Sequence, residues 1–513
     1  MRKTTMILAA LTILLVMFCA EAYAEESGFQ PADLPVVVLN IDGGQEEIDR
    51  LNNSEDHSYR CTGTLDILVP EGYSGQIDGR YPQKNVSGLK IRYIRGRGQG
   101  SWGMDKHPYK IKLEDKADLF GMGKARTWVL LANYFDDSLM RNWMVQWMGE
   151  QVGLEYTPQG VFVEVVMNGD YLGSYYLCEQ VQLNKARVAI DELKEEDREE
   201  PAIQGGYLLE FCPNEEEGPD AFETARGLRL GTMNPSFDPE NDGYVNDIQK
   251  NYIRDYVQKA EDAIFSEDGS YAEYLDLQSL ADYWWIMEFV MNEDAFYTDS
   301  QHMFKPRFEP DGSEGRLHFG PLWDFDASLG NRQTVTEQET GFGNTVFIWM
   351  DELRKKPEFR EALKERWLVL DEKLEELVRD GGALDRAAAV VKGSWYRDEE
   401  RWHAFKEERD MLPLRSFEQE TEHLKKWISL RREWIREHLD ELGILTYTLT
   451  FRGEGMEEES YDVPAYMRLN VYTYMEETPE AEGKQFVGWA AEDGTLTENF
   501  VVSQDTVLTA RFE

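Results

Sequence analysis

The sequence predicts an α+β protein, because strand patterns fill its first half and helical patterns fill most of its second half. Short runs of alternating hydrophobicity, separated by glycine and asparagine clusters, extend from Leu34 to about Cys212. After about residue 250, apolar residues recur mainly at helical spacing. The composition returns to alternating strands at Gly443, so residues 443–513 are expected to form a separate small β domain. Within the larger domain, residues 34–442, we expect a cleft between the β-rich and the helical parts.

The strands of the first half are predicted from short runs rich in β-branched, leucine and aromatic residues. They fall within residues 34–41, 61–70, 89–98, 109–115, 127–135, 160–183 and 205–212. The range 160–183 is predicted to be a hairpin, with its turn at Asn168-Gly169-Asp170.

The first helix is predicted to begin near Asp136-Asp137, where these aspartates and Ser138 favour a helix N-terminus. Its methionine and tryptophan stripe is expected to pack in the core. The stripe consists of Met140, Trp143, Met144, Trp147, Met148 and Val152. Later helices are predicted at about 250–266, 277–294, 356–380, 384–400 and 414–441. One strand, "RLHFGPLWDFD", is expected to interrupt them.

The N-terminus has the pattern of a secretory signal peptide. Arg2 and Lys3 precede the apolar run Met6 to Phe18, and Ala22-Tyr23-Ala24 supplies small residues for cleavage after Ala24. Residues 25–33 are expected to be a linker. The apolar run is too short for a stable membrane span. We therefore expect a secreted or cell-surface protein that is not stably inserted in the membrane.

The net charge and the pattern of cysteines and histidines disfavour some classes of binding partner and of metal site. The chain has 98 acidic and 54 basic side chains, a formal net charge of −44, which disfavours nucleic acid and anionic lipid as partners. It suits a basic protein partner or divalent cations, although it is also what a solvated acidic surface requires. After cleavage Cys61, Cys178 and Cys212 remain, without a CxxC pair, and buried thiols are expected. The histidines lack the close spacing of a zinc site.

A glycine-rich basic segment, "IRGRGQGSWGMDKHPYKIKLEDK", stands out in this acidic chain. Its glycines would let backbone N–H groups approach an anion, and Arg97 and Ser101 lie between them. The segment predicts a phosphate cradle, or else a flexible hairpin turn. In the strand that follows, alternation places Lys110 and Lys112 on one face. That face could hold phosphates or could be an ordinary solvated surface.

Two acidic segments in the helical half could provide catalysis. Asp294 follows an apolar helix in "MEFVMNEDAF" and could accept a hydroxyl proton, although capping and surface charge also explain such clusters. In "GPLWDFDASLGN", alternation separates Trp323 and Phe325 from Asp324 and Asp326. Two carboxylates in an apolar strand predict a divalent cation, with Arg97 or backbone N–H groups as the alternative partners. Glycine loop, lysine strand, aspartate and late aspartate follow the chain order of a protein kinase.

At these motifs the sequence resembles the CotH family, the kinase-like proteins named for spore coat protein H. The likeness runs from about Leu34 to Asn331 and includes "RGRGQGSWG", "KHPYKIKLEDKADLFGM", "WVLLANYFDDSLMRNWM", "VMNGDYLGSYYLCEQVQL", "NEDAF" and "WDFD". The resemblance implies an atypical two-lobed protein-kinase fold with a β-rich N-lobe and a helical C-lobe. It also implies ATP as phosphate donor, Mg²⁺ or Mn²⁺, and transfer to Ser/Thr of extracellular or surface proteins.

The resemblance also assigns roles by position. Asp294 matches the catalytic base and Asp324 matches the metal-binding aspartate, with Asp326 as a possible second ligand. Lys110 or Lys112 would hold phosphates, and Arg97 and Ser101 lie in the segment that would cover ATP. Glu179 matches a glutamate of the family's hairpin, with its partner left open. Gln99-Gly100 departs from the family's Asn-Ser pair, and no asparagine follows Asp294 where some members place one.

The C-terminal segment "FVGWAAEDGTLT…VLTARF" resembles a bacterial surface-protein repeat of the Listeria–Bacteroides type, a β-grasp-like module. Such a module would act as a spacer or contact the cell wall or a surface partner. The alternative function is therefore an inactive, kinase-shaped surface protein that binds a protein or glycan.

Overall fold

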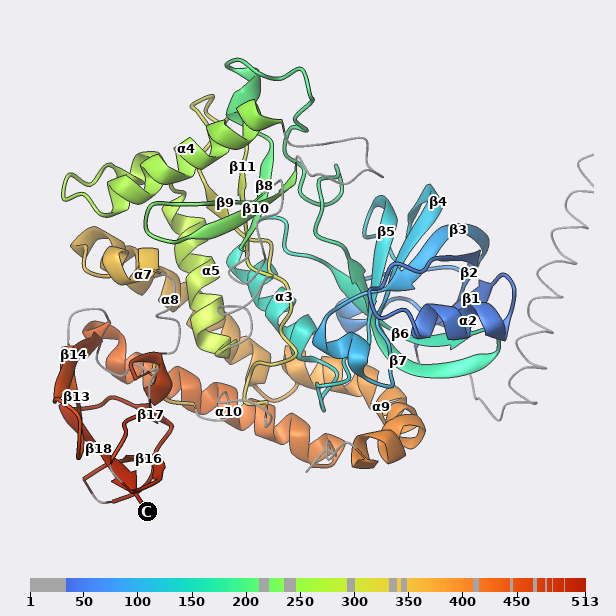
Figure 1. Cartoon of the computed structure of the whole chain (residues 1–513). Helices are drawn as coiled ribbons and strands as arrows, with labels where there is room; N and C mark the ends of the chain where they lie inside the picture. Colours follow the sequence, from blue (N-terminus) through green and yellow to red (C-terminus); the bar gives the residue numbers. More distant parts are fainter. Residues whose placement is uncertain are drawn as a thin grey trace, which may run out of the picture. The chain divides into compact units, whose positions relative to one another are not determined.

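The computed structural model describes most of the chain. The described residues are 34–211, 221–234, 246–292, 300–331, 339–342, 348–408, 415–442 and 446–513, without 465–467, 476–477, 482 and 493. They form two compact units. The first contains residues up to Leu139, Gln159–Gln180 and Asp385–Phe417, and the second contains Met140–Pro158, Val181–Leu384 and Glu418–Glu513. Strands and helices both occur throughout, which confirms the α+β class (Figure 1).

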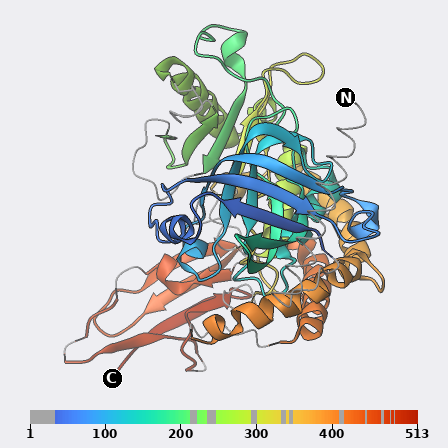
Figure 2. The ribbon, with the colours of Figure 1, turned by 90° about the vertical axis from the view of Figure 1, so that its right-hand side faces the viewer.

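The first unit is built around a closed seven-stranded barrel in the order β1-β2-β3-β4-β5-β7-β6, drawn in blue to teal in Figure 2. Its strands are β1 (Val36–Ile41), β2 (Cys61–Leu68), β3 (Val86–Gly96), β4 (Tyr109–Asp118), β5 (Lys124–Leu131), β6 (Gly160–Met167) and β7 (Asp170–Glu179). The pair β1–β6 is parallel, and the other neighbours are antiparallel. A short helix, α2 (Gln45–Asn52), follows β1. Closing the sheet removes its exposed edges, and alternate side chains fill the interior.

The predicted hairpin is confirmed in β6 and β7. Met167 pairs with Asp170, so the turn consists of Asn168 and Gly169, and both have positive φ. The Asn168 side chain also accepts from the N–H of Ile41 at 2.6 Å and donates to its carbonyl at 3.0 Å. The asparagine therefore makes the turn and joins it to β1.

Helix α9 (Ala383–Glu408) contributes most of its length to the first unit and is tied to the barrel by ion pairs. Lys106 Nζ lies 2.6 Å from Asp398 Oδ1, and both side chains are buried. Glu164 on β6 pairs with Arg397 at 2.6 Å. A segment distant in sequence thus supports both β6 and the loop that precedes β4.

The second unit combines helices with a five-stranded antiparallel sheet of order β12-β11-β8-β10-β9. The strands are β8 (Tyr207–Phe211), β9 (Ala221–Glu223), β10 (Arg229–Asn234), β11 (His302–Lys305) and β12 (His318–Phe319). The helices are α3 (Arg141–Val152), α4 (Asp247–Ile264), α5 (Leu277–Val290), α7 (Ile348–Leu353), α8 (Pro357–Val378) and α10 (Phe417–His438). Helix α5 is buried along almost its whole length and packs on α3 and α8.

The start that was predicted near Asp136 for the helix that is α3 in the structure was wrong. Helix α3 begins at Arg141, and Asp136 lies in the preceding turn, where it accepts from the N–H and hydroxyl of Ser138. Acidic and hydroxyl residues favour such a turn as strongly as a helix cap. The core role of the Met140–Val152 stripe is confirmed, since all of its members are buried.

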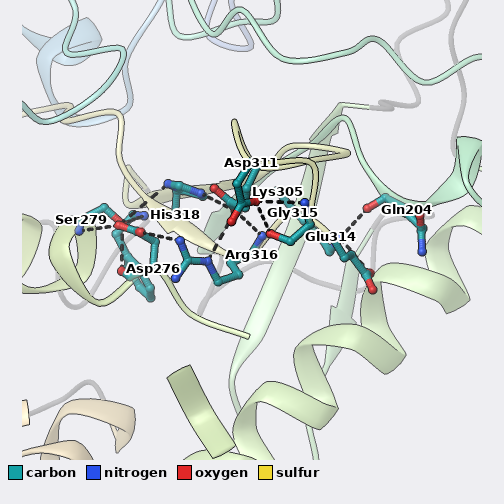
Figure 3. A network of polar contacts seen from close by, with 12 residues as sticks. Gln204, Asp276, Ser279, Lys305, Asp311, Glu314, Gly315, Arg316 and His318 are labelled. Atoms are coloured by element: carbon teal, nitrogen blue, oxygen red, sulfur yellow. Dashed lines mark hydrogen bonds and ion pairs between the residues drawn. The ribbon is translucent and has the colours of Figure 1, made fainter. Parts of the chain in front are cut away.

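The hairpin of β11 and β12 is fixed to the start of α5 by a polar network (Figure 3). Asp276 caps α5 by accepting from the N–H of Ser279 at 2.8 Å, and it pairs with Arg316 at 3.2 Å. Glu309 accepts from the N–H of Arg316 at 2.8 Å and lies 3.1 Å from His318 Nε2. These bonds hold the hairpin that leads directly into the segment containing Asp324.

A buried lysine lies in the same network (Figure 3). Lys305 is fully buried, donates to the carbonyl of Gln204 at 2.5 Å and pairs with Glu314 at 3.2 Å. Its ammonium group also lies 4.3 Å from the ring centre of Tyr256. Burial lowers the pKa of Lys305 to about 8, although Glu314 opposes the shift.

The C-terminal strands form sheets of their own, drawn in red in Figure 1. They are β13 (Thr446–Arg452), β14 (Glu459–Pro464), β15 (Arg468–Asn470), β16 (Phe486–Ala490), β17 (Asn499–Val501) and β18 (Thr506–Phe512). A four-stranded sheet has the order β14-β13-β18-β16, and β15 pairs with β17. Their buried side chains, among them Phe451, Trp489 and Leu508, make a separate hydrophobic cluster. The domain boundary at Gly443 stays a prediction.

Two further observations concern the burial of the cysteines and the length of the helices. Cys61 and Cys178 are buried thiols that form no disulfide with a described residue, and their burial is as expected, whereas Cys212 lies outside the described residues. None of the described helices is both long and apolar enough to cross a membrane.

Candidate functional site

The predicted site residues divide between the two units. Arg97, Ser101, Lys110, Lys112 and Glu179 belong to the first unit. The two carboxylates of the "WDFD" segment, Asp324 and Asp326, belong to the second. The predicted base, Asp294, lies outside the described residues.

The glycine-rich segment connects the antiparallel strands β3 and β4, whose last pair is Gly96 with Tyr109. It contains a short 3₁₀ helix, Gly100–Gly103. Gly98 has φ +77°, and a Cβ atom there would lie 2.5 Å from Ser101 Oγ. Glycine fits this position because another residue would be strained at this φ and its Cβ atom would lie too close to the Ser101 hydroxyl group. The predicted hairpin connection is confirmed, and its role as a phosphate cradle stays a prediction.

Trp102 anchors this segment, a role that the sequence analysis missed. Its indole N–H donates to the carbonyl of Ser54 at 3.0 Å, and its ring lies 4.5 Å from the ring of His107. A Cβ atom at Gly96 would lie 2.5 Å from the Trp102 ring. A tryptophan inside a glycine-rich run was the available signal, because such a large apolar ring is rarely left in solvent.

The strands that flank the segment carry positive charge on one face. Arg95 lies opposite Lys110 in the β3–β4 register, and Lys112 lies opposite Tyr93. Lys112 Nζ is 5.6 Å from the Tyr93 ring centre. Burial lowers the pKa of the nearby His57, and the charges of Arg95 and Arg97 add to this shift, whereas Asp56 opposes it.

The predicted alternation of β4 is present in the structure. Tyr109, Ile111 and Leu113 are buried, whereas Lys110 and Lys112 are partly exposed. Both lysines are therefore partly accessible on the same face of β4.

Glu179 ends β7 and is buried. Its Oε2 atom accepts from the N–H of Gln159 at 3.0 Å, and its own N–H donates to the Gln159 carbonyl at 3.0 Å. These contacts assign Glu179 a part in holding the start of β6.

The "WDFD" segment is not the strand that alternation predicted. Strand β12 ends at Phe319, and Asp324 has φ +65°, a left-handed conformation that a strand excludes. The separation of side chains is nevertheless present, because Trp323 and Phe325 are buried while Asp324 and Asp326 are partly exposed. A left-handed non-glycine residue costs of the order of 1–3 kcal/mol and persists only where its surroundings enforce it.

Three asparagines supply that enforcement, one for each successive residue. Asn292, just after α5, donates its amide to the Asp324 carbonyl at 2.7 Å. Asn142 on α3 accepts from the N–H of Phe325 at 3.0 Å. Asn331 donates to the Asp326 carbonyl at 2.7 Å. We call Asn142, Asn292 and Asn331 the asparagine clamp.

Buried arginines hold the rest of this loop. Arg141, beside Asn142 on α3, donates to the Ser328 carbonyl at 2.8 Å and pairs with Glu420 at 2.7 Å. Both members of that pair are buried. The N–H of Leu329 donates at 2.8 Å to the carbonyl of Val290, which is the last residue of α5. Helices α3 and α5 therefore bond the loop directly, and α10 holds Arg141 in place through Glu420.

A second buried pair stabilises the end of α5. Glu288 and Arg431 lie 2.8 Å apart and are fully buried, and Arg431 also donates to the Gly341 carbonyl. This pair lies one turn before Asn292. It therefore fixes the helix end from which the Asp294 segment departs.

The carboxylates of Asp324 and Asp326 have the chemistry of ligands for a hard cation. Carboxylate oxygens suit Mg²⁺ and Mn²⁺, which proteins often bind through one or two carboxylates with phosphate oxygens completing the shell. Within the described ranges, no three His, Cys, Asp or Glu side chains gather as a metal site.

Comparison with known proteins identifies the family. A family model described as CotH kinase protein matches residues 94–435, about two thirds of the chain. No curated protein matches the chain. The matched range includes every predicted site residue, and the chain is a kinase-like protein. It belongs to the CotH family. The match begins later than Leu34, where the motif resemblance begins, and it extends beyond Asn331 into α10.

Proposed function

We propose that this CotH protein is a secreted protein kinase that transfers the γ-phosphate of ATP to Ser or Thr of extracellular or surface proteins. The observation that supports it most is the left-handed Asp324, held by the asparagine clamp at the position where the family resemblance expects a metal-binding aspartate. Backbone strain maintained by so many contacts is characteristic of functional sites.

We assign each group of predicted site residues one role in phosphate transfer. Asp324 and Asp326 hold Mg²⁺ or Mn²⁺, which when bound offsets charge on the phosphates. The glycine-rich segment, with Arg97 and Ser101, covers the nucleotide. Lys110 or Lys112 contacts phosphate oxygens.

The remaining tasks concern the acceptor and the overall architecture. Asp294 accepts the proton of the acceptor hydroxyl. Glu179 orients the phosphate-binding side through its strand. The two units act as the N-lobe and C-lobe of a kinase.

The ends of the chain complete the proposal. Residues 1–24 direct export and are cleaved after Ala24. Residues 443–513 form a β-grasp-like repeat that contacts the cell wall or a surface partner. The second candidate is an inactive kinase-shaped protein that binds a protein or glycan, which the departure of Gln99-Gly100 from the family's Asn-Ser pair favours.

Phosphate transfer from labelled ATP, with Mn²⁺ present, separates the two candidates. The wild-type mature chain should label itself or an added protein. Asp324→Ala should abolish labelling, whereas Asp380→Ala, which removes an exposed carboxylate at the end of α8, should not. Labelling that persists in Asp324→Ala would exclude the metal role of this residue. A wild-type chain without labelling or nucleotide binding would favour the binding protein.

A further inference from the structure

One oxygen atom of the asparagine clamp has no hydrogen-bond partner among the residues that the structure describes. Asn292 is fully buried, and its Oδ1 atom accepts no hydrogen bond from the described residues. A buried acceptor left unsatisfied costs about 1–3 kcal/mol, so such an atom calls for a physical explanation.

The orientation of this amide is determined by its neighbour. Its nitrogen lies 2.7 Å from the Asp324 carbonyl oxygen, which can only accept. Exchanging nitrogen and oxygen would place two acceptors against each other. The Oδ1 atom must therefore point away from the Asp324 carbonyl, toward another donor or a cation.

The position of Asn292 is equally constrained. Met291 ends α5 with φ +53°, which turns the chain sharply before Asn292. The Leu329 N–H, bonded to the Val290 carbonyl, fixes the same helix end to the Asp324 loop. Amide and loop are therefore held together before any ligand binds, as a preorganised site requires.

We propose that Asn292 Oδ1 is a neutral third oxygen ligand of the divalent cation held by Asp324 and Asp326. This inference rests on the proposed function. Asparagine carbonyl oxygens are accepted ligands of hard divalent cations. The proposal gives this oxygen a partner where the described residues supply no hydrogen-bond donor.

Two substitutions separate the ligand role from the hydrogen bond to Asp324. Asn292→Leu has a similar shape but removes both the donor and the oxygen. Asn292→Asp also removes the donor, yet it keeps an oxygen and adds charge. If Asn292 is a ligand, only the leucine variant weakens cation binding. If Asn292 acts through its hydrogen bond alone, both variants weaken it.

The measurement is the affinity of the mature chain for Mn²⁺ alone, from the free-ion electron paramagnetic resonance signal. We expect Asn292→Leu to lose at least about tenfold in affinity, because even outer-shell partners of metal sites contribute that much. We expect Asn292→Asp to bind Mn²⁺ at least as tightly as the wild type. Weakened binding in Asn292→Asp, or unchanged binding in both variants, would overturn the inference.

Matched controls come from Asn234, which ends β10 and donates to the Gly206 carbonyl at 2.8 Å. Asn234→Leu and Asn234→Asp should leave Mn²⁺ affinity unchanged. Thermal unfolding in a chelator shows whether each variant folds, and Asn292→Ala, which also removes the oxygen, replaces the leucine variant if that variant does not. Wild type and Asp324→Ala with equal or no Mn²⁺ binding would reject the cation site itself. A Mn²⁺ site that requires Asp324 but ignores Asn292 would reject this inference alone.

Discussion

Asp324 shows how a single residue can be strained where chemistry is expected. Its left-handed backbone disfavours any side chain, yet the position carries aspartate rather than glycine. Asp326, two residues later, lies in the same loop without positive φ. The pair therefore allows the cost of the conformation to be measured within one segment.

We predict opposite orders of stability at these two positions. At residue 324, glycine should be more stable than alanine by about 1 kcal/mol, because glycine accepts positive φ without strain. At residue 326, alanine should be the more stable, because glycine has more conformational entropy in the unfolded chain. Urea unfolding of the four single variants in a chelator tests this. Alanine more stable than glycine at both positions would show that Asp324 is not strained in solution.

The lowered pKa of Lys305 predicts a pH dependence of the free energy of unfolding that can be assigned to this one side chain. Its folded pKa of about 8 lies below the ordinary value of 10.5, so its contribution to stability is fully present above pH 10.5 and is lost as pH falls through about 8. The wild type should therefore gain stability relative to Lys305→Met as pH rises from 8 to 10.5. The shift corresponds to a gain of the order of 3 kcal/mol.

Equilibrium unfolding of both proteins across this pH range measures the difference. Glu314→Gln serves as the directional control. Glu314 raises the pKa of Lys305, so its removal should move the change to lower pH. A difference that stays constant with pH would contradict the assignment to Lys305.

At the scale of elements, the ion pairs of α9 differ in burial and therefore in their expected contribution. The Lys106–Asp398 pair is almost fully buried, and Asp398 also accepts from the N–H of Ser174 at 2.8 Å. The Arg401–Asp170 pair joins the same helix to β7 but is exposed. Buried pairs are costly to break one partner at a time, whereas exposed pairs contribute little.

We predict that Lys106→Met lowers the free energy of unfolding by about 3–5 kcal/mol, because it leaves the Asp398 carboxylate buried without its cation. Arg401→Ala should cost less than about 1 kcal/mol. Adding Asp398→Leu to Lys106→Met should restore part of the loss, since it removes the unpaired charge. Equal costs for the lysine and arginine variants in denaturant titrations would disprove this ranking.

On the scale of the whole molecule, the C-terminal strands have sheets and a hydrophobic cluster of their own. A segment with its own core can fold and unfold as a unit. Its removal should therefore spare the candidate sites in the preceding residues.

We predict that a variant ending at Leu442 keeps the Mn²⁺ and ATP affinity of the full chain. Residues 443–513 expressed alone should show a cooperative thermal transition. Calorimetry of the full chain, the shortened chain and the isolated segment provides the comparison. Loss of nucleotide binding in the shortened chain would place the module within the kinase function.

Features that depend on contacts between residues close in the sequence were predicted more successfully than features that depend on distant contacts. The hairpin at Asn168, the buried Met140–Val152 stripe and the alternation of Lys110 and Lys112 all follow from patterns within one element. The expected start of α3 and the expected "WDFD" strand were wrong. At Asp136 two local preferences, a turn and a helix cap, compete, and the turn forms, whereas at Asp324 contacts with other elements enforce the left-handed backbone.

Taken by itself, the sequence determined the α+β class, most elements, and the order of motifs that identifies the CotH family, because periodicity and motif order are local properties of the chain. Only the tertiary structure showed that Asn142, Asn292 and Asn331 grip consecutive residues, and that Lys106 finds its counter-charge on α9. Apart from Asn331, which lies five residues from Asp326, these partners are distant in sequence, and their pairing is decided by the packing of whole elements. No propensity of the individual residues encodes it.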